Sequence, residues 1–411
     1  MEPVLFVSHQ ATRTGAPHVL LHLLRWVRAN TDLDVHVLLL RPGPLEPEFS
    51  ALGPLTVLTD VPLGQGLTLV ERELAKGRLR DVSAAIRQLF RLRLRHLRGF
   101  GVVYLNSICS VPSMRYLPSP PRTVITHVHE LALGIQCALT PSLLAPLPAA
   151  DRRDPLRSTD LFIAAAEGVK ANLVASGVPE NKVRRHYEFI DVERALAAPD
   201  RTAVVRRELG LPSSTRVVVA SGTFEWRKGP DLFVHLARRM FERRPEEDVQ
   251  FLWVGGGSGG AEDWFLAHDV RQSGLEGRLR FLGSRPNPLD YFRLADVFVL
   301  TSREDPFPLV CLEASVLGTP VVSFDNGGMR EFLAEGRGVV VPYLDIDAMA
   351  AAVEHMLDDP AVRRLIGEQA SARVRSHHDV SVVAPALLED VRLAVERPAP
   401  RGTRTVAQGR I

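Results

Sequence analysis

The stretch VVVASGTFEWRKGPD, residues 217–231, decides the fold. Its first residues are apolar or small and predict a buried strand over Val217–Ser221. A polar loop follows, and from Pro230 to about Phe241 apolar residues recur at helical spacing. Pro230 suits the first helical position, where its missing N–H is not needed. A strand that leads through a short loop into a helix is the unit of parallel sheets with helical cover.

The same unit recurs on both sides of this stretch. Downstream, short apolar runs predict strands over Gln250–Val254, Leu279–Leu282, Val297–Thr301, Pro320–Phe324 and Gly338–Val341. Upstream, a helix is expected over about Pro17–Arg28, with strands over Val4–Ser8, Val35–Leu40, Val102–Leu105, Val124–Thr126 and Leu161–Ala164. The sequence therefore predicts the α/β class, with two successive doubly wound, Rossmann-like domains of parallel sheet.

The length of 411 residues agrees with two domains of roughly 150–200 residues each. We place the first domain at 1–190 and the second at 191–380, with the link inside 188–206, where Ala195–Thr202 is small, acidic and contains proline. Residues 397–411 have no apolar period, which predicts a disordered tail. Ligands of such sheets bind beyond the carboxyl ends of the strands, so we expect a cleft between two facing sheets.

Composition excludes several classes of function. The net charge of +2 gives no support for a nucleic-acid partner. The three cysteines, Cys109, Cys137 and Cys311, are far apart and form no CxxC pair, so neither a disulfide framework nor a zinc site is expected. The first residues lack the basic segment of a signal peptide, and no apolar run approaches the roughly 18 residues that span a bilayer. We expect a cytoplasmic protein.

A basic stretch from Arg72 to Arg98 stands apart from the alternating pattern. Arginines are interleaved there with leucines, as in an amphipathic helix that lies on an anionic membrane surface. The same pattern also fits a solvated helix face on the first domain. Both interpretations stay open, and the first predicts peripheral contact with the inner face of a membrane.

Two adjacent cations, Arg227 and Lys228, precede Gly229 at the turn between the strand and the helix. A diphosphate that leaves a sugar gains negative charge, and a cation beside a helix N-terminus stabilises that charge. An exposed Arg-Lys pair in a turn is also common, so this motif alone leaves both interpretations open.

A second motif, SREDPFPLVCLEA at 302–314, also lies between a strand and a helix. Pro308 suits the first helical turn, which leaves backbone N–H groups for an anion at Phe307, Leu309 and Val310. Asp305 before the helix and Glu313 within it can accept hydrogen bonds from sugar hydroxyls. The alternatives are a helix N-cap for Asp305 and a solvated carboxylate for Glu313.

The spacing of Asp305 and Glu313, with the Arg227-Lys228-Gly229 turn upstream, resembles the retaining glycosyltransferases of family 4, which have the GT-B fold. The resemblance implies that Asp305 contacts the donor sugar, that Glu313 holds the nucleotide ribose and that the basic pair binds the diphosphate. Two positions depart from the family pattern. Asp305 is one methylene shorter than the usual glutamate, and Thr223 occupies the place of an arginine whose charge we expect Arg227 to supply.

The first domain agrees with this resemblance. The loop at Gly15 and Ala16 resembles the family's first glycine loop, which approaches the donor phosphates, although a simple helix N-terminus explains it equally well. His129, in the sequence HVHE, matches the family histidine near the reacting sugar, and we expect His127 to face the opposite side. The resemblance further implies a helix over 381–396 that packs back on the first domain.

Four weaker signals lie in other loops. Arg285 is expected beside the nucleobase, and Glu331 follows a Gly-Gly pair like that of the family. The glycine-rich run at 254–260 formally contains G-x-G-x-x-G, but no acidic residue ends the next strand, so we interpret the run as a flexible turn. Asp345-Ile346-Asp347 imitates a metal-binding D-x-D, and we expect Asp347 to be a helix N-cap and no metal to be required.

The resemblance implies a hexosyltransferase of class EC 2.4 that needs no cofactor. It would move a sugar from a nucleoside-diphosphate sugar, with UDP or GDP expected, to a hydroxyl of a glycan, a lipid-linked saccharide or a secondary metabolite, as in polysaccharide biosynthesis. Two alternatives remain open: a GT-B epimerase that acts on a sugar nucleotide, and a non-catalytic homologue that binds nucleotide sugars.

Overall fold

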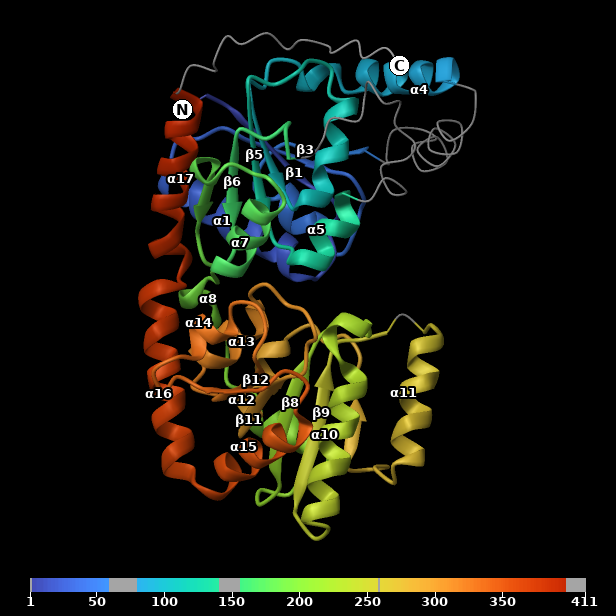
Figure 1. Cartoon of the computed structure of the whole chain (residues 1–411), viewed down its shortest axis with the longest axis vertical. Coiled ribbons are helices and arrows are strands. Elements are labelled where there is room, and N and C mark those ends of the chain that lie inside the picture. Colours follow the sequence, from blue (N-terminus) through green and yellow to red (C-terminus); the bar gives the residue numbers. More distant parts are fainter. Residues whose placement is uncertain (1, 59–79, 140–155, 258, 397–411) are drawn as a thin grey trace. The chain divides into compact units, whose positions relative to one another are not determined.

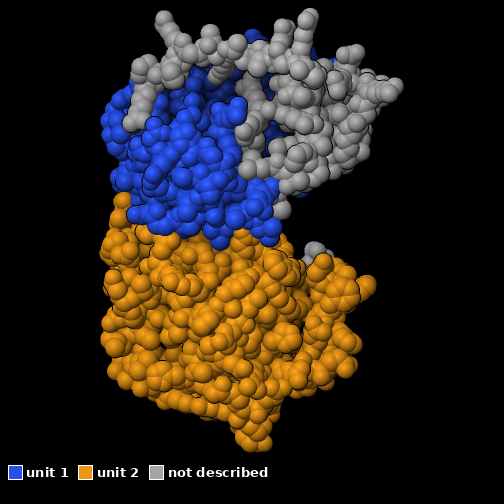
Figure 2. Space-filling view, viewed as in Figure 1, with its two compact units in different colours: residues 1–186, 383–411 blue, residues 187–382 orange. Residues whose placement is uncertain are grey.

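The structure is a computed structural model that describes residues 2–58, 80–139, 156–257 and 259–396. The chain divides into two compact units (Figure 2), the first formed by Met1–His186 with Val383–Ile411 and the second by Tyr187–Val382. The predicted tail at 397–411 and the first part of the basic stretch, 72–79, lie outside the described residues. Each unit has its own parallel sheet (Figure 1).

The first unit has a seven-stranded sheet in the order β3-β2-β1-β4-β5-β6-β7. Its strands are β1 (Val4–Ser8), β2 (Val35–Leu39), β3 (Leu55–Val57), β4 (Val102–Asn106), β5 (Thr123–Val128), β6 (Leu161–Ala164) and β7 (Val183–Arg185). Neighbouring strands pair in parallel, and the strand order reverses between β1 and β4. The loops that leave these two strands therefore flank the switch point of the sheet.

Helices connect these strands. They are α1 (Gly15–Asn30), α2 (Glu46–Ser50), α4 (Arg80–Arg93), α5 (Ala132–Leu139), α7 (Glu167–Ala175) and the short 3₁₀ turns η2 (Arg95–Leu97), η3 (Ile108–Tyr116) and η4 (Glu180–Lys182). In α1, Leu20, Leu23, Leu24 and Val27 recur at helical spacing and are all buried, which explains why this segment is a helix against the sheet.

The second unit repeats the topology with six strands in the order β10-β9-β8-β11-β12-β13. The strands are β8 (Arg216–Ser221), β9 (Val249–Val254), β10 (Leu279–Phe281), β11 (Val297–Leu300), β12 (Val321–Phe324) and β13 (Val339–Val341). All pairs are parallel, and the order reverses between β8 and β11. The prediction of two doubly wound parallel sheets is confirmed.

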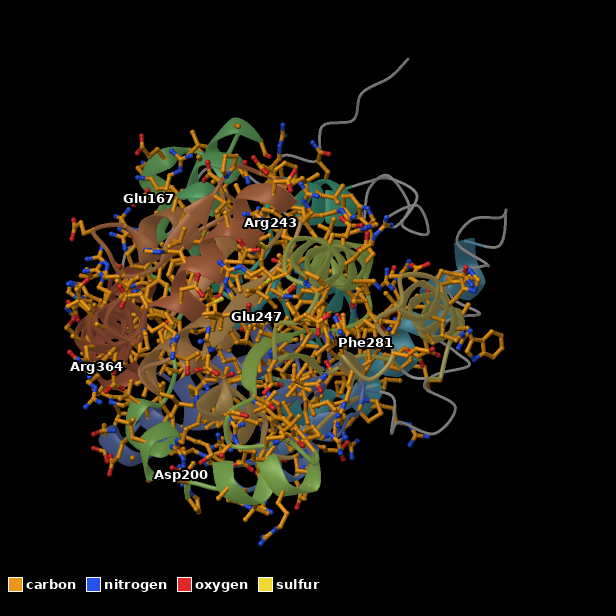
Figure 3. The ribbon with its side chains drawn as sticks, turned by 90° about the horizontal axis from the view of Figure 1, so that it is seen from below. Glu167, Asp200, Arg243, Glu247, Phe281 and Arg364 are labelled. Carbon is orange, nitrogen blue, oxygen red and sulfur yellow. The ribbon has the colours of Figure 1, made fainter. Side chains whose placement is uncertain are left out.

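Helices also cover the second sheet. They are α8 (Val192–Ala197), α9 (Thr202–Glu208), η5 (Trp226–Lys228), α10 (Pro230–Arg243), α11 (Ala261–Gln272), α12 (Pro288–Leu294), α13 (Leu309–Val316), α14 (Met329–Leu333), α15 (Ile346–Asp358) and α16 (Pro360–His377). Ion pairs join α10 and its end to α15: Arg243 lies 2.9 Å from Glu354, and Arg244 forms a two-point pair with Asp358 (Figure 3 labels Arg243).

Two predictions near element boundaries were wrong, those for the linker and for the cap of α15. The stretch expected to be a linker, Ala195–Thr202, contains the end of α8 and the start of α9. The last helix, α17, runs over Val380–Glu396, within one residue of the predicted 381–396, and has Pro385 inside it. The cap of α15 is Asp345, whose carboxylate accepts from the N–H of Ala348 at 2.8 Å, while Asp347 is already inside the helix. The N–H of the third helical residue is the usual partner of a capping carboxylate, and Asp345 is in the right place for it.

Candidate functional site

The topology of the second sheet brings the two sequence motifs together. Because β8 and β11 are neighbours at the switch point, the loops that leave their carboxyl ends lie side by side. The loop after β8 contains η5, with Arg227 and Lys228, and the loop after β11 contains Asp305. This edge of a doubly wound sheet is where such folds bind their ligands.

Hydrogen bonds to backbone carbonyls fix the two loops to each other. The N–H of Arg303 donates to the carbonyl of Arg227 at 2.8 Å, and the hydroxyl of Thr301 donates to the carbonyl of Gly229 at 2.8 Å. Gly229 has a φ of 68°, and a Cβ there would lie 2.2 Å from the Thr301 carbonyl oxygen. Only glycine therefore allows this approach of the two loops.

Arg303 is a structural residue that the sequence reasoning missed. Its guanidinium forms a two-point pair with Asp231 in the first turn of α10, at 2.9 and 2.6 Å, and also donates to the carbonyl of Trp226 at 2.9 Å. The hydrogen bond to Asp231 raises the pKa of Arg303 above its ordinary value. Such bidentate pairs hold geometry well, so Arg303 locks η5 and α10 to the loop after β11.

Lys228 and Asp305 form an ion pair at the centre of this edge. The Lys228 Nζ lies 2.5 Å from Asp305 Oδ2, and the two side chains are 18% and 6% exposed. The Ser302 hydroxyl lies 3.5 Å from the same carboxylate oxygen. The N-cap alternative for Asp305 is wrong, because Pro308 precedes the first residue of α13 and occupies the cap position. The prediction that Pro308 lies inside the first helical turn is wrong by one residue.

Arg227 and Thr223 lie in the loop after β8 with Lys228. The Arg227 guanidinium donates to the carbonyl of Glu304 at 3.2 Å and lies 3.6 Å from the Glu225 carboxylate. Thr223 is partly buried between the end of β8 and η5. Arg227 thus contacts the loop that contains Asp305, but its ion pair is with Glu225, whereas Lys228 pairs with Asp305.

The start of α13 presents backbone N–H groups, as the second motif predicted. Leu309 and Val310 are its first two residues, and the first N–H groups of a helix have no partner within it. The side chain of Phe307 has a packing role, because its ring lies 5.4 Å from that of Tyr187 and 5.1 Å from that of His378. Phe307 can therefore contribute its backbone to an anion site, but not its side chain.

Glu313 is partly buried on α13, and burial raises its pKa to about 7. The solvated-carboxylate alternative is therefore wrong: desolvation disfavours the charged form of this side chain. A group with this pKa changes protonation near neutral pH. It is suited to accept hydrogen bonds from hydroxyls of a bound molecule once it is ionised.

The loop after β12 packs on the Asp305 loop. A Cβ at Gly327 would lie 1.8 Å from the Asp305 carbonyl oxygen, and the N–H of Gly328 donates to the Pro306 carbonyl at 2.7 Å. The Gly-Gly pair is thus required for packing, and Glu331 follows it in α14. Arg285 is exposed in the loop after β10, two strands from β8, and it stays a prediction.

Two glycines of the run after β9, Gly255 and Gly256, are required by close packing. A Cβ at Gly255 would lie 2.6 Å from the Gly222 carbonyl oxygen, and one at Gly256 would lie 2.3 Å from the Phe224 ring. The Phe224 ring in turn contacts Phe281 at a centroid distance of 5.1 Å (Figure 3 labels Phe281). These two glycines therefore allow the segment after β9 to pack closely against the loop that follows β8.

A second polar cluster lies in the first unit, after β1, β4 and β5. His129 Nε2 lies 2.8 Å from Asn106 Oδ1, and Asn106 Nδ2 donates to the carbonyl of Ala16 at 2.8 Å. Glu130 accepts from the His129 N–H at 2.9 Å and from the Ser107 hydroxyl. Asn106, Ser107 and Glu130 were not assigned a role from the sequence, since their partners come from distant segments.

The prediction that His127 faces away from His129 is wrong. Their ring centroids are 4.1 Å apart, because residues two apart in an extended strand share a face. His127 is fully buried, its Nδ1 lies 2.8 Å from the Tyr104 hydroxyl, and burial lowers its pKa well below the ordinary 6.5. His9, also missed, has its pKa lowered by burial in spite of the nearby Glu130 charge.

Gly15 and Ala16 are the first residues of α1. A Cβ at Gly15 would meet no protein atom within 4 Å, so packing does not require glycine here. Gly15 and Ala16 are thus the N-terminus of a helix, as the alternative interpretation predicted. The space next to the Gly15 Cα is open to an approaching group.

Comparison with known proteins assigns a family to most of the second unit. Residues 202–373 match the family described as glycosyl transferases group 1. This part of the chain is a group 1 glycosyltransferase domain. The family that the motifs indicated is confirmed.

The D-inositol 3-phosphate glycosyltransferases are related in sequence. That of Corynebacterium glutamicum is 35% identical over 191 residues, which cover 45% of this chain and 46% of that protein. That of Kineococcus radiotolerans is 34% identical over 229 residues, or 52% of each chain. The chain thus spans about half the length of these relatives.

Solved structures of the same fold cover nearly the whole chain. HepE of Anabaena, in complex with UDP and glucose, has a TM-score of 0.75 at 20% identity, and the match covers 95% of this chain and 100% of HepE. Sucrose-phosphate synthase from Thermosynechococcus elongatus has a TM-score of 0.71 at 21% identity, with 96% and 99% covered. At these identities the likeness shows the fold, and the predicted GT-B fold class is confirmed.

Proposed function

We propose that this chain is a retaining, metal-independent glycosyltransferase that moves a sugar from a nucleoside-diphosphate sugar to an acceptor hydroxyl. The observation that carries the proposal is the Lys228–Asp305 pair beside the first N–H groups of α13, within the group 1 domain. A cation and helix N–H groups at one sheet edge form a site for a diphosphate, and a carboxylate beside them suits sugar hydroxyls.

The proposed roles follow from these positions. Lys228 and Arg227 neutralise the diphosphate, and the backbone at Thr223, Phe307, Leu309 and Val310 lines it. Asp305 accepts from hydroxyls of the donor sugar, and Glu313 accepts from the ribose. Lys228 then shares its charge between Asp305 and the phosphate oxygens, and its attraction to the phosphate strengthens as negative charge grows on the leaving group.

Retention is proposed to proceed by attack on the same face of the sugar. The bond between the anomeric carbon and the leaving phosphate oxygen breaks while the acceptor oxygen bonds to that carbon. The proton of the acceptor hydroxyl passes to the leaving phosphate oxygen, so no strong protein base is required. In the first unit, Gly15 and Ala16 would approach the donor phosphates and His129 the sugar, while Arg285 would lie beside the nucleobase.

The comparisons support a choice of substrates to test. Anabaena HepE was solved with UDP-glucose, which supports UDP over GDP as the first donor to examine. The relatives named for D-inositol 3-phosphate support a small phosphorylated polyol as one acceptor, next to glycans, lipid-linked saccharides and secondary metabolites. We propose a role in polysaccharide or glycoconjugate synthesis in the cytoplasm. The alternatives are an epimerase and a non-catalytic binding protein.

The basic helix supports a peripheral membrane contact in this proposal. In α4, Leu89 and Leu92 are 41% and 58% exposed beside the exposed Arg91 and Arg93. Exposed leucines flanked by arginines suit a surface of anionic lipid. No helix in the described part of the chain has the length and apolar character needed to span a bilayer. Co-sedimentation with anionic vesicles, lost in a Leu89→Gln, Leu92→Gln variant, is the expected result; equal binding by the variant would contradict it.

A two-step experiment tests the activity. Thermal-shift measurements against UDP-, GDP-, ADP- and TDP-sugars identify the donor, because a ligand that binds the folded state raises Tm. Release of nucleoside diphosphate is then measured with and without acceptors. A transferase releases nucleotide only when an acceptor is present, whereas an epimerase interconverts the sugars without release. A protein that binds donors but shows neither reaction is a non-catalytic homologue.

Lys228→Ala is the matched test of the mechanism. We expect turnover to fall by roughly 100-fold or more, because the charge on the leaving group loses its cation. The control is Lys170→Ala, which removes a surface lysine paired with Glu180 at 2.9 Å. Unchanged turnover in Lys228→Ala would falsify the assigned mechanism. Activity that persists in excess EDTA is the result expected for a metal-independent enzyme, and its loss would contradict that part of the proposal.

A further inference from the structure

Asn106 is a fully buried polar residue at the end of β4. Its side-chain amide makes two hydrogen bonds with partners from different segments. Nδ2 donates to the carbonyl of Ala16 in the first turn of α1, and Oδ1 lies 2.8 Å from His129 Nε2. One amide thus joins the start of α1 to the segment that follows β5.

The chemistry of these partners leaves one arrangement of protons. A backbone carbonyl can only accept, so the amide nitrogen must face Ala16 and the amide oxygen must face His129. An amide oxygen also can only accept, so Nε2 of His129 must carry a proton. In the neutral ring, Nδ1 is then the nitrogen that holds the lone pair.

We propose that Asn106 is the positioning residue of the first unit's site, holding His129 as its Nε2-protonated tautomer and tying it to the start of α1. The functional part of this inference rests on the proposed glycosyltransferase activity. With its proton on Nε2, the neutral His129 ring has an acceptor rather than a donor at Nδ1, so it cannot donate a proton from that nitrogen.

The backbone around Asn106 is held in an unusual conformation that supports this role. The next residue, Ser107, has a φ of 88°, which is uncommon for a residue other than glycine. Its N–H donates to the His127 carbonyl at 2.8 Å, and its hydroxyl donates to Glu130. Unfavourable backbone angles persist where surrounding contacts determine them, and such positions cluster at functional sites.

The carboxylate of Glu130 completes the support of His129. It accepts from the His129 N–H at 2.9 Å and from the Ile108 N–H at 3.4 Å. The backbone of His129 is thus fixed by Glu130 and its ring by Asn106. Orienting contacts of this kind commonly set which ring nitrogen of a histidine carries the proton.

The tautomer can be observed directly by NMR in the full-length protein labelled with ¹⁵N-histidine. At a pH well above the ordinary histidine pKa of about 6.5, a proton bonded to His129 Nε2 and hydrogen-bonded to Asn106 should exchange slowly and be visible. His129→Gln assigns the signal by its loss. A wild-type signal from a proton on Nδ1, or no protected Nε2 proton at all, overturns the proposal.

Three variants separate positioning from general stability. Asn106→Leu removes both hydrogen bonds at similar volume and should abolish the protected Nε2–H signal. Asn106→Asp keeps an acceptor towards His129 and should retain the signal, and it also serves if the leucine variant does not fold. Ser110→Ala is the control, because its hydroxyl donates to the Asn106 carbonyl at 2.8 Å and not to the amide. A protected signal that survives in Asn106→Leu overturns the proposal.

Turnover gives the second readout. Asn106→Leu should lower kcat/KM by roughly tenfold or more, the effect of one lost hydrogen bond in the transition state, while Ser110→Ala stays near wild type. Unchanged kcat/KM in Asn106→Leu overturns the positioning role. If the wild-type protein shows the protected Nε2–H but transfers no sugar, the proposed function fails and the tautomer assignment stands.

Discussion

At the scale of single residues, Glu313 is a group whose charge state changes near neutral pH. Burial raises its pKa to about 7, so half of the free protein carries a neutral acid there at that pH. A ribose hydroxyl donates better to a carboxylate than to the neutral acid. Bound nucleotide should therefore favour the ionised form and release a proton on binding.

This predicts a pH dependence of nucleotide affinity. Between about pH 6 and about pH 8 the ionised fraction of a group with this pKa rises up to about tenfold, and affinity should rise with it. Titration calorimetry in buffers of different ionisation heat measures both the affinity and the proton release. Glu313→Gln should flatten the dependence, whereas Glu242→Gln on the exposed side of α10 should not. If nucleotide affinity depended on pH equally in Glu313→Gln and in the wild type, another group would be responsible for the titration.

At the scale of elements, two glycines lie at the starts of helices, and the structure restricts only one of these positions to glycine. Gly229 precedes α10 with a φ of 68°, and a Cβ there would lie 2.2 Å from the Thr301 carbonyl oxygen. Gly15 begins α1 in open space. The first is required by the fold, and the second is proposed to be required by a ligand.

Gly229→Ala and Gly15→Ala therefore form a matched pair. Gly229→Ala should lower Tm clearly, because strain and the clash cost on the order of 1–3 kcal/mol together. Gly15→Ala should keep or slightly raise Tm, since alanine favours a helix by about 1 kcal/mol over glycine, and should weaken donor binding. Tm and nucleotide Kd are the measurements. Wild-type donor affinity in Gly15→Ala would remove this loop from the donor site.

The elements also show why sequence reasoning succeeded in part. The strands were predictable because short apolar runs such as Val297–Leu300 end in turn residues, and the topology then brings Lys228 and Asp305 together. Arg303 and Asn106 were not predictable, because their partners are backbone carbonyls and side chains far away in the chain. No local period marks a side chain whose role depends on tertiary contacts.

At the scale of the whole molecule, the two units hold buried titratable groups of opposite kind. The first contains His9, His36 and His127, all with pKa values lowered chiefly by burial. The second contains Glu313, with its pKa raised by burial. A histidine whose pKa is lowered in the folded state binds more protons in the unfolded state. The free energy of unfolding of its unit therefore decreases as the pH falls below about 6.5.

The sign is reversed for Glu313. A carboxyl with a raised pKa binds more protons in the folded state between 4.5 and about 7, so it adds stability to the second unit as pH falls through that range. Mild acidification should therefore weaken the first unit relative to the second. Hydrogen exchange by mass spectrometry, with rates corrected for the intrinsic effect of pH, measures this separately for peptides of each unit.

We expect the peptides of β4 and β5 to lose protection between about pH 7.5 and about pH 5.5, because protonation of His127 is linked to unfolding of the first unit. Peptides of β8 and β11 should change less. His127→Gln keeps a polar group near Tyr104 but removes the titration, so it should reduce the acid sensitivity of the first unit. His235→Gln on α10 is the control, because this histidine lies in the other unit. Equal loss of protection in both units, or an unchanged response in His127→Gln, would show that His127 does not set the acid sensitivity of its unit.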